Sequence, residues 1–89
     1  MDVNLNLYKY FLAVMETRSV SLAAEKLGVS QPTVSYSIHA LQRDLGEQLF
    51  TIGKHGIIPT PRAVDLCQKL RLLYKQLVQV VMYFINETK

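Results

Sequence analysis

The sequence predicts a mainly α-helical fold, with three short helices around one small core, a small β-hairpin, and a long helix at the C-terminal end. Two observations predict it. Apolar residues recur at helical spacing in several stretches, and two short apolar runs flank a glycine-bounded polar tip at residues 53–56. At 89 residues, 49% of them hydrophobic, the chain fits one globular unit.

The first predicted helix covers residues 5–17, where the apolar residues fall on one broad face. The second covers about residues 22–27. Ser21 is expected to cap it, because a serine hydroxyl accepts from an otherwise unpaired backbone N–H. Gly28 follows the last leucine, at the position where helices commonly end.

The third predicted helix covers residues 31–45, after a tight turn at residues 28–30. Ser30 is its expected N-cap, proline is tolerated in its first turn, and Gly46 ends it. This helix has two faces. An apolar stripe suited to the core contains Val34, Ile38, Leu41 and Leu45, and an opposite stripe contains Pro32, Tyr36, His39 and Arg43.

Residues 49–52 and 57–59 are expected to form the hairpin, with Lys54 and His55 at its tip. The last helix is expected to begin at Pro61, capped by Thr60, and to reach about Asn86. Such a helix is roughly 39 Å long, too long to be buried against so small a core. We therefore divide the chain into a unit at residues 1–60 and a dimerisation helix at residues 61–89.

A helix, a short glycine-containing turn, a second helix and a hairpin together predict a winged helix-turn-helix. This arrangement favours sequence-specific binding of double-stranded DNA, with the helix at residues 31–45 in the major groove. Gln31 can pair with adenine, and the Thr33 methyl can contact a thymine methyl. The predicted DNA-binding residues are Ser30, Gln31, Pro32, Thr33, Ser35, Tyr36, His39, Arg43, Lys54 and His55.

Apolar residues of the last helix are spaced alternately four and three apart, which is the pattern of a helix pair. The chain is therefore predicted to form a homodimer through this helix. The predicted interface residues are Leu66, Leu70, Leu73, Leu77, Val80 and Phe84.

Composition bounds the remaining possibilities. A net charge of +3 and a pI near 9.2 fit a polyanion partner. The single cysteine, Cys67, excludes a disulfide within the chain, suits a reducing cytoplasm, and is interpreted as a packing residue. We find no metal-ligand spacing, catalytic constellation, signal peptide or apolar run of about 20 residues. A cytoplasmic, non-enzymatic protein without cofactor, metal or membrane contact is expected.

Residues 19–35 read Ser-Val-Ser-Leu-Ala-Ala-Glu-Lys-Leu-Gly-Val-Ser-Gln-Pro-Thr-Val-Ser, and this stretch resembles LysR-type transcriptional regulators. The resemblance continues to about residue 66. It implies a DNA-binding winged helix-turn-helix, a linker helix that pairs antiparallel with a second chain, and a separate effector-binding domain that this chain lacks. The chain is then either a piece of such a regulator or a short natural protein. Matches to the family's DNA contacts are Gln31, Pro32, Thr33, Ser35 and Tyr36, with Ser30 near phosphate.

Two positions depart from the resemblance. The family usually has Glu where Gln42 stands and Arg where Ile52 stands. We hypothesise that a neutral arrangement replaces an ion pair here, since a single unpaired charge costs more than the loss of both. Two other functions remain open, namely a dimerisation module that acts on protein partners and a nonspecific nucleic-acid binder.

Overall fold

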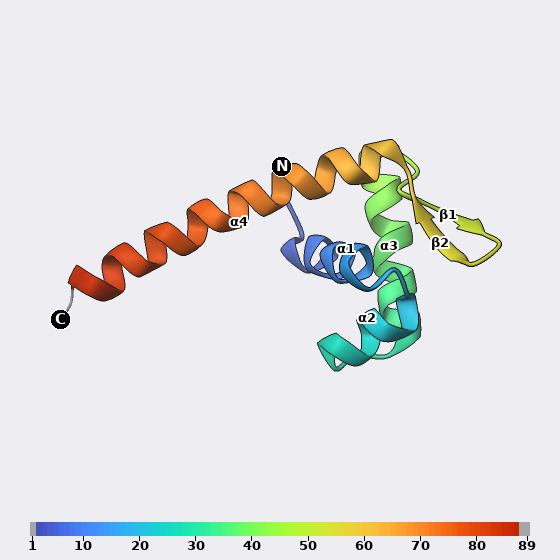
Figure 1. Ribbon diagram of the computed structural model, residues 1–89, viewed down its shortest axis with the longest axis horizontal. Coiled ribbons are helices and arrows are strands. Elements are labelled where there is room, and N and C mark those ends of the chain that lie inside the picture. The colour runs from blue at the N-terminus through green and yellow to red at the C-terminus, as the bar shows by residue number, and fades with distance from the viewer. Residues whose placement is uncertain (1, 88–89) are drawn as a thin grey trace.

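The computed structural model describes residues 2–87. Its elements follow the order α1 (Leu5–Thr17), α2 (Val20–Leu27), α3 (Gln31–Leu45), β1 (Phe50–Gly53), β2 (Gly56–Pro59) and α4 (Pro61–Glu87). Helices α1–α3 pack into a body, the hairpin projects from one side of it, and α4 extends far beyond the other (Figure 1). The predicted mainly α-helical fold is confirmed. The outer ends of the two predicted units, residues 1 and 88–89, lie outside the described residues.

The start of α2 differs from its prediction. The helix begins at Val20, and its N-cap is Ser19, whose hydroxyl accepts from the Leu22 N–H at 3.1 Å. The prediction of Ser21 as the cap was wrong. Ser19 has the extended backbone that a cap needs, with φ −152° and ψ 129°, whereas Ser21 already lies in the first helical turn. Gly28 ends the helix with φ +70°, as predicted.

Helix α3 covers the predicted residues. The Ser30 hydroxyl accepts from the Thr33 N–H at 3.3 Å, and Gly46 ends the helix with φ +64°. Three members of the predicted core stripe, Val34, Ile38 and Leu41, are buried. Leu45 was predicted to be the fourth but is 39% exposed. It lies in the last turn of α3, where it borders an open hollow that faces the start of α4.

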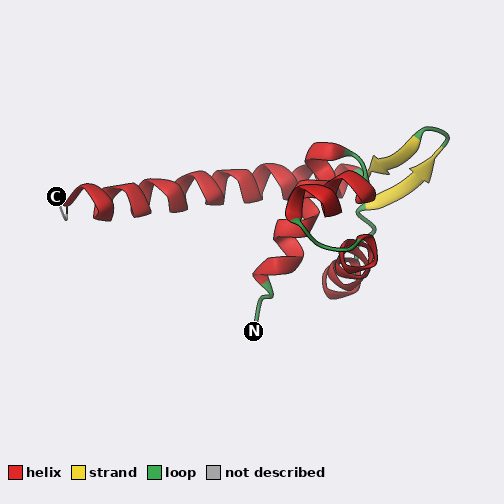
Figure 2. Cartoon of the chain, turned by 90° about the horizontal axis from the view of Figure 1, so that it is seen from below, coloured by secondary structure: helices red, strands yellow, loops and turns green. Residues whose placement is uncertain are grey.

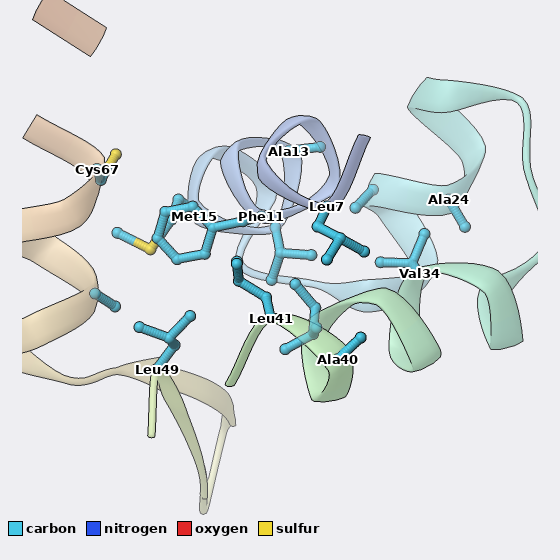
Figure 3. Packing of buried hydrophobic residues seen from close by; sticks show 14 residues of the cluster. Leu7, Phe11, Ala13, Met15, Ala24, Val34, Ala40, Leu41, Leu49 and Cys67 are labelled. Atoms are coloured by element: carbon cyan, nitrogen blue, oxygen red, sulfur yellow. The ribbon is translucent and has the colours of Figure 1, made fainter. Parts of the chain in front are cut away.

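The core contains buried residues from all four helices and from the segment before β1 (Figure 3). Phe11, Leu41 and Leu49 are its largest fully buried side chains. Each contributes about 1.5–3 kcal/mol through removal of apolar surface from water. Cys67 is 7% exposed within this cluster, which fits its interpretation as a packing residue. Ala63 is also buried, so the core extends into the first turns of α4.

Strands β1 and β2 pair antiparallel, and the register places Phe50 opposite Pro59 and Gly53 opposite Gly56. The strands begin and end about one residue away from the predicted bounds. Lys54 and His55 alone form the tip. Gly56 has φ +118°, a conformation that side chains rarely adopt, and a Cβ at Gly53 would collide with the Ile58 side chain.

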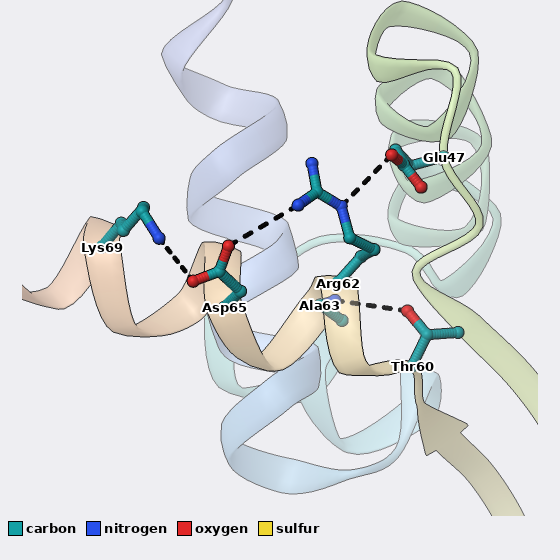
Figure 4. A network of polar contacts seen from close by, with 6 residues as sticks. All are labelled: Glu47, Thr60, Arg62, Ala63, Asp65 and Lys69. Atoms are coloured by element: carbon teal, nitrogen blue, oxygen red, sulfur yellow. Dashed lines mark hydrogen bonds and ion pairs between the residues drawn. The ribbon is translucent and has the colours of Figure 1, made fainter.

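Helix α4 begins at the predicted cap, because the Ala63 N–H donates to the Thr60 hydroxyl at 3.2 Å. Arg62 pairs with Glu47 at 3.2 Å and with Asp65 at 3.7 Å, and Lys69 also pairs with Asp65 (Figure 4). From residue 71 to residue 87 every residue of α4 is exposed, and Figure 2 shows the C-terminal part of the helix extending beyond the body. No helix within residues 2–87 is both long and apolar enough to cross a membrane.

Candidate nucleic-acid interface

The turn between α2 and α3 brings the N-terminal end of α3 to the surface. Val29 closes it by donating its N–H to the Ala24 carbonyl at 3.0 Å. Ala23 and Ala24 are buried, and their small side chains permit close approach of the two helices. The tight turn and the close packing together fix the orientation of α3 relative to α2.

The N-cap and first turn of α3 carry four of the predicted site residues. Gln31, Pro32 and Thr33 are exposed, and Ser30 lies just before the helix. The hydroxyls of Ser30 and Thr33 are 2.7 Å apart and share a hydrogen bond. The Gln31 side-chain oxygen accepts from the Ser21 hydroxyl at 3.1 Å. The polar groups at this end of α3 are therefore held by one another and by α2.

Further along α3, the predicted residues separate into two groups. Ser35 and His39 border a hollow of about 440 Å³ between α3 and the hairpin, which Phe50, Ile52 and Ile57 also line. Tyr36 is 66% exposed. Arg43 is exposed near the C-terminal end of the helix, beside a shallow hollow. The structure thus places Ser35 and His39 against the hairpin side of α3.

The hairpin tip carries the last two predicted residues, Lys54 and His55, and both are exposed. The tip projects away from the body in Figure 1. These two residues form the whole turn, because the flanking strands are paired up to Gly53 and Gly56. A cation at the end of a projecting hairpin suits contact with a phosphate backbone.

Two stretches of the sequence around α3 and the hairpin carry only basic charges, and Asp44 and Glu47 lie between them. No Asp or Glu occurs at residues 26–43 or at residues 48–64, whereas Lys26, Arg43, Lys54 and Arg62 do. The first turn of α3 has no acidic residue, so its free N–H groups and the positive end of its dipole are not offset. This surface therefore favours an anionic partner such as a phosphate backbone.

Gln42 connects α3 to the hairpin. Its side-chain oxygen accepts from the Leu49 N–H at 2.9 Å and from the Phe50 N–H at 3.3 Å. Ile52, the suggested partner of Gln42 in a neutral pair, is 92% exposed, and the two residues border the same hollow. The partner of Gln42 is therefore the backbone at the start of β1. The sequence spacing carried no signal for this contact.

Two acidic side chains that lie outside the candidate interface, Glu16 and Asp65, form ion pairs with lysines. Glu16 of α1 pairs with Lys26 of α2 at 2.6 Å, and hydrogen bonding to that ammonium group lowers the pKa of Glu16. The hydrogen bond from Lys69 likewise lowers the pKa of Asp65. Both carboxylates therefore stay charged and paired at neutral pH. Within residues 2–87 no three His, Cys, Asp or Glu side chains are arranged to hold a metal ion.

The predicted dimer stripe divides in the structure. Leu66 and Leu70 are partly buried against the chain's own core. Beyond them Leu73, Leu77, Val80 and Phe84 are 61%, 58%, 53% and 59% exposed. A groove of about 630 Å³ lies between α1 and α4 and is lined by residues that include Leu5, Leu12, Leu70, Leu73 and Leu77. Leu73 and Leu77 thus line an apolar groove, and Val80 and Phe84 extend the exposed stripe toward the C-terminal end of α4.

The helices, turn and hairpin define a winged helix-turn-helix. Residues 5–64 match the family model described as bacterial regulatory helix-turn-helix protein, lysR family, and the chain belongs to that family.

Two relatives are similar over most of this chain. The HTH-type transcriptional activator NagR of Ralstonia sp is 43% identical over 67 residues, which cover 75% of this chain and 22% of NagR. The HTH-type transcriptional regulator LeuO of Escherichia coli is 42% identical over 77 residues, 86% of this chain and 24% of LeuO. The chain thus spans about a quarter or less of these relatives.

The fold is also similar to that of a solved complex, the BenM DBD with catB site 1 DNA. The match has a TM-score of 0.89 and 31% identity, and it covers 98% of each chain.

Proposed function

We propose that this chain binds double-stranded DNA with sequence specificity, as the DNA-binding part of a LysR-type transcriptional regulator. Helix α3 enters the major groove, where its first turn reads bases, and the hairpin acts as a wing on the backbone. The observation that carries this is the exposed start of α3, with its polar side chains held in place and no acidic residue in its first turn. The similarity to the BenM DBD, solved with DNA, supports it.

Each proposed contact has a role suited to its place. Gln31, Thr33 and Ser35 face bases, and Pro32 and Tyr36 contribute apolar contact beside them. Ser30, His39 and Arg43, together with Lys54 and His55 of the wing, contact the sugar–phosphate backbone. The proposal assigns no catalytic step and needs no cofactor, and it places the protein in the cytoplasm, where bacterial DNA is found.

Titration with a library of duplexes at several salt concentrations tests the proposal. Specific binding is expected, and Gln31→Ala should weaken binding to the best site by about 1–3 kcal/mol while it relaxes preference at one base pair. If Gln31→Ala weakens all sequences equally, Gln31 positions the protein instead of reading a base. A salt slope without sequence preference would favour a nonspecific binder, and no binding would favour a module that acts on protein partners.

We also propose that two copies pair through the exposed half of α4, so that residues 1–60 contact DNA and residues 61–89 join the chains. The proposed interface is the exposed part of the predicted stripe, with Leu73, Leu77, Val80 and Phe84. Leu66 and Leu70 support it from within their own chain. A row of exposed leucine, valine and phenylalanine would otherwise favour aggregation. Two-fold pairing presents two α3 helices to an interrupted inverted repeat.

A further inference from the structure

The hydrogen bond between Ser21 and Gln31 crosses from α2 to α3. The Ser21 hydroxyl donates to the Gln31 side-chain oxygen at 3.1 Å, although the residues lie ten positions apart. Ser21 is available for this contact because Ser19, two residues earlier, caps α2. Gln31 is the first residue of α3 and is exposed, so this bond joins the supporting helix to the proposed base-reading end.

A glutamine side chain ends in a carboxamide, which presents an acceptor oxygen on one side and two N–H donors on the other. An unrestrained carboxamide can turn by half a rotation and offer either side to a base. In the structure the Ser21 hydroxyl holds the Gln31 oxygen toward α2. Rotation of the carboxamide would break this bond, and the hydroxyl would have to turn before it could accept from the side-chain nitrogen instead. The side-chain nitrogen of Gln31 is then directed away from Ser21.

We propose that Ser21 is a positioning residue that sets the base preference of Gln31, an inference that rests on the proposed function. With its oxygen held toward α2, Gln31 presents N–H donors to the major groove. It therefore selects a base with an acceptor edge, namely the N7 of a purine, the O6 of guanine or the O4 of thymine. Cytosine, whose major-groove edge offers the N4 donor, is the base that it disfavours most.

The test compares the unmodified chain with Ser21→Ala, Ser21→Thr, Gln31→Ala and the double variant Ser21→Ala/Gln31→Ala. Each is incubated with a duplex library of randomised sequence, and the bound fraction is sequenced. Gln31→Ala identifies the base pair that Gln31 reads. Ser21→Ala should reduce discrimination against cytosine at that same position by about two- to tenfold, the effect of losing one neutral hydrogen bond. Ser21→Thr, which keeps the hydroxyl, should retain the preference.

The double variant distinguishes positioning from an independent contact. Because Ser21 acts through Gln31, adding Ser21→Ala to Gln31→Ala should change nothing further. Alanine is the better helix former at an exposed helical position, so the variant should fold, and its melting temperature checks this.

Three results would overturn the inference: an unchanged preference in Ser21→Ala, a change at a different base pair, or an equal loss on all sequences with a smaller salt slope. The last result would identify Ser21 as a phosphate contact. An unmodified chain without any sequence preference would overturn the proposed function and this inference together. A specific unmodified chain with an unaffected Ser21→Ala would overturn this inference alone.

Discussion

The body of the molecule and the outer half of α4 are stabilised in different ways. In the body, Phe11, Leu41 and Leu49 are almost fully buried, and side-chain caps or left-handed residues end the helices. In residues 71–87 every side chain is exposed, although eleven of the seventeen residues are large and hydrophobic. A single helix of this length is marginal in water. The body therefore has a core of its own, whereas the outer half of α4 buries none of its side chains within the chain, which supports the proposed pairing.

The largest expected effect comes from substitutions in the exposed half of α4, which should abolish pairing and leave the body folded. Leu77→Asp places a charge in the exposed stripe, and we expect a monomer whose DNA affinity is lower by roughly a hundredfold, because two half-sites are no longer engaged together. Leu73→Asp should act alike. The melting transition of the body should persist, since neither side chain is buried. Sedimentation and DNA titration measure the two effects.

Gln79→Asp is the matched control, because it adds the same charge at an exposed position on a face of α4 that points away from the stripe, and it should leave the dimer intact. An unmodified chain that sediments as a monomer at about tens of micromolar would contradict the pairing.

The next effect lies inside the body, at Gln42. Gln42→Met removes the acceptor for two backbone N–H groups at the start of β1, so the free energy of unfolding should fall by about 1–3 kcal/mol. Gln42→Glu keeps an acceptor there but adds a charge with no cation at position 52, and we expect a smaller loss. Chemical denaturation measures both. Equal stability of Gln42→Met and the unmodified chain would show that these bonds contribute little.

The former hypothesis of a neutral pair is tested by combining Gln42→Glu with Ile52→Arg. If the new charges interact, the double variant should recover part of the stability that Gln42→Glu loses. If the changes in the free energy of unfolding were strictly additive, the side chains at positions 42 and 52 would not interact. Ile52→Arg alone is the control, and its exposed side chain should tolerate the change.

Local chemistry explains how much the sequence predicted. The bounds of α1 and α3 followed from helical periodicity and from Ser30 and Gly46, because caps and left-handed glycines act within a few residues. The α2 cap was misplaced because Ser19 and Ser21 are chemically equal, and only the backbone conformation distinguishes them. Leu45 was misassigned because periodicity gives a direction but not the extent of the neighbouring surface.

The candidate site shows the same limit. The exposure of Tyr36 and His39 followed from their place on the face opposite the apolar stripe. The bond from Ser21 to Gln31 depends on the angle between α2 and α3, and that of Gln42 depends on the path of the chain after Gly46. Both contacts depend on the tertiary structure, so no local sequence pattern predicts them.

A smaller effect is expected at the wing, where a change should affect neither stability nor pairing. Lys54→Ala should weaken binding to specific and random DNA alike and reduce the slope of log affinity against log salt by about one, because one phosphate contact is lost. Lys75→Ala removes the same charge from α4 and is the control, with a smaller change in slope expected. An unchanged slope in Lys54→Ala would mean that the wing tip remains in solvent.

The smallest expected effect concerns the ion pair that joins α1 to α2 in the body. Because the pKa of Glu16 is lowered from its ordinary value of 4.5 by Lys26, its pairing stabilises the folded chain above that value. This contribution is lost as pH falls through the lower folded pKa. Both side chains are largely exposed, at 59% for Glu16 and 47% for Lys26, so solvent screens the pair and the effect is small. Glu16→Gln should therefore melt slightly below the unmodified chain at pH 7, and the two curves should converge in acid. Lys26→Met, which removes the other partner, should show the same convergence, and sedimentation should be unchanged in both because neither residue lies in the exposed half of α4. A melting difference that stays constant across pH would show that Glu16 stabilises the body by packing instead of by its charge.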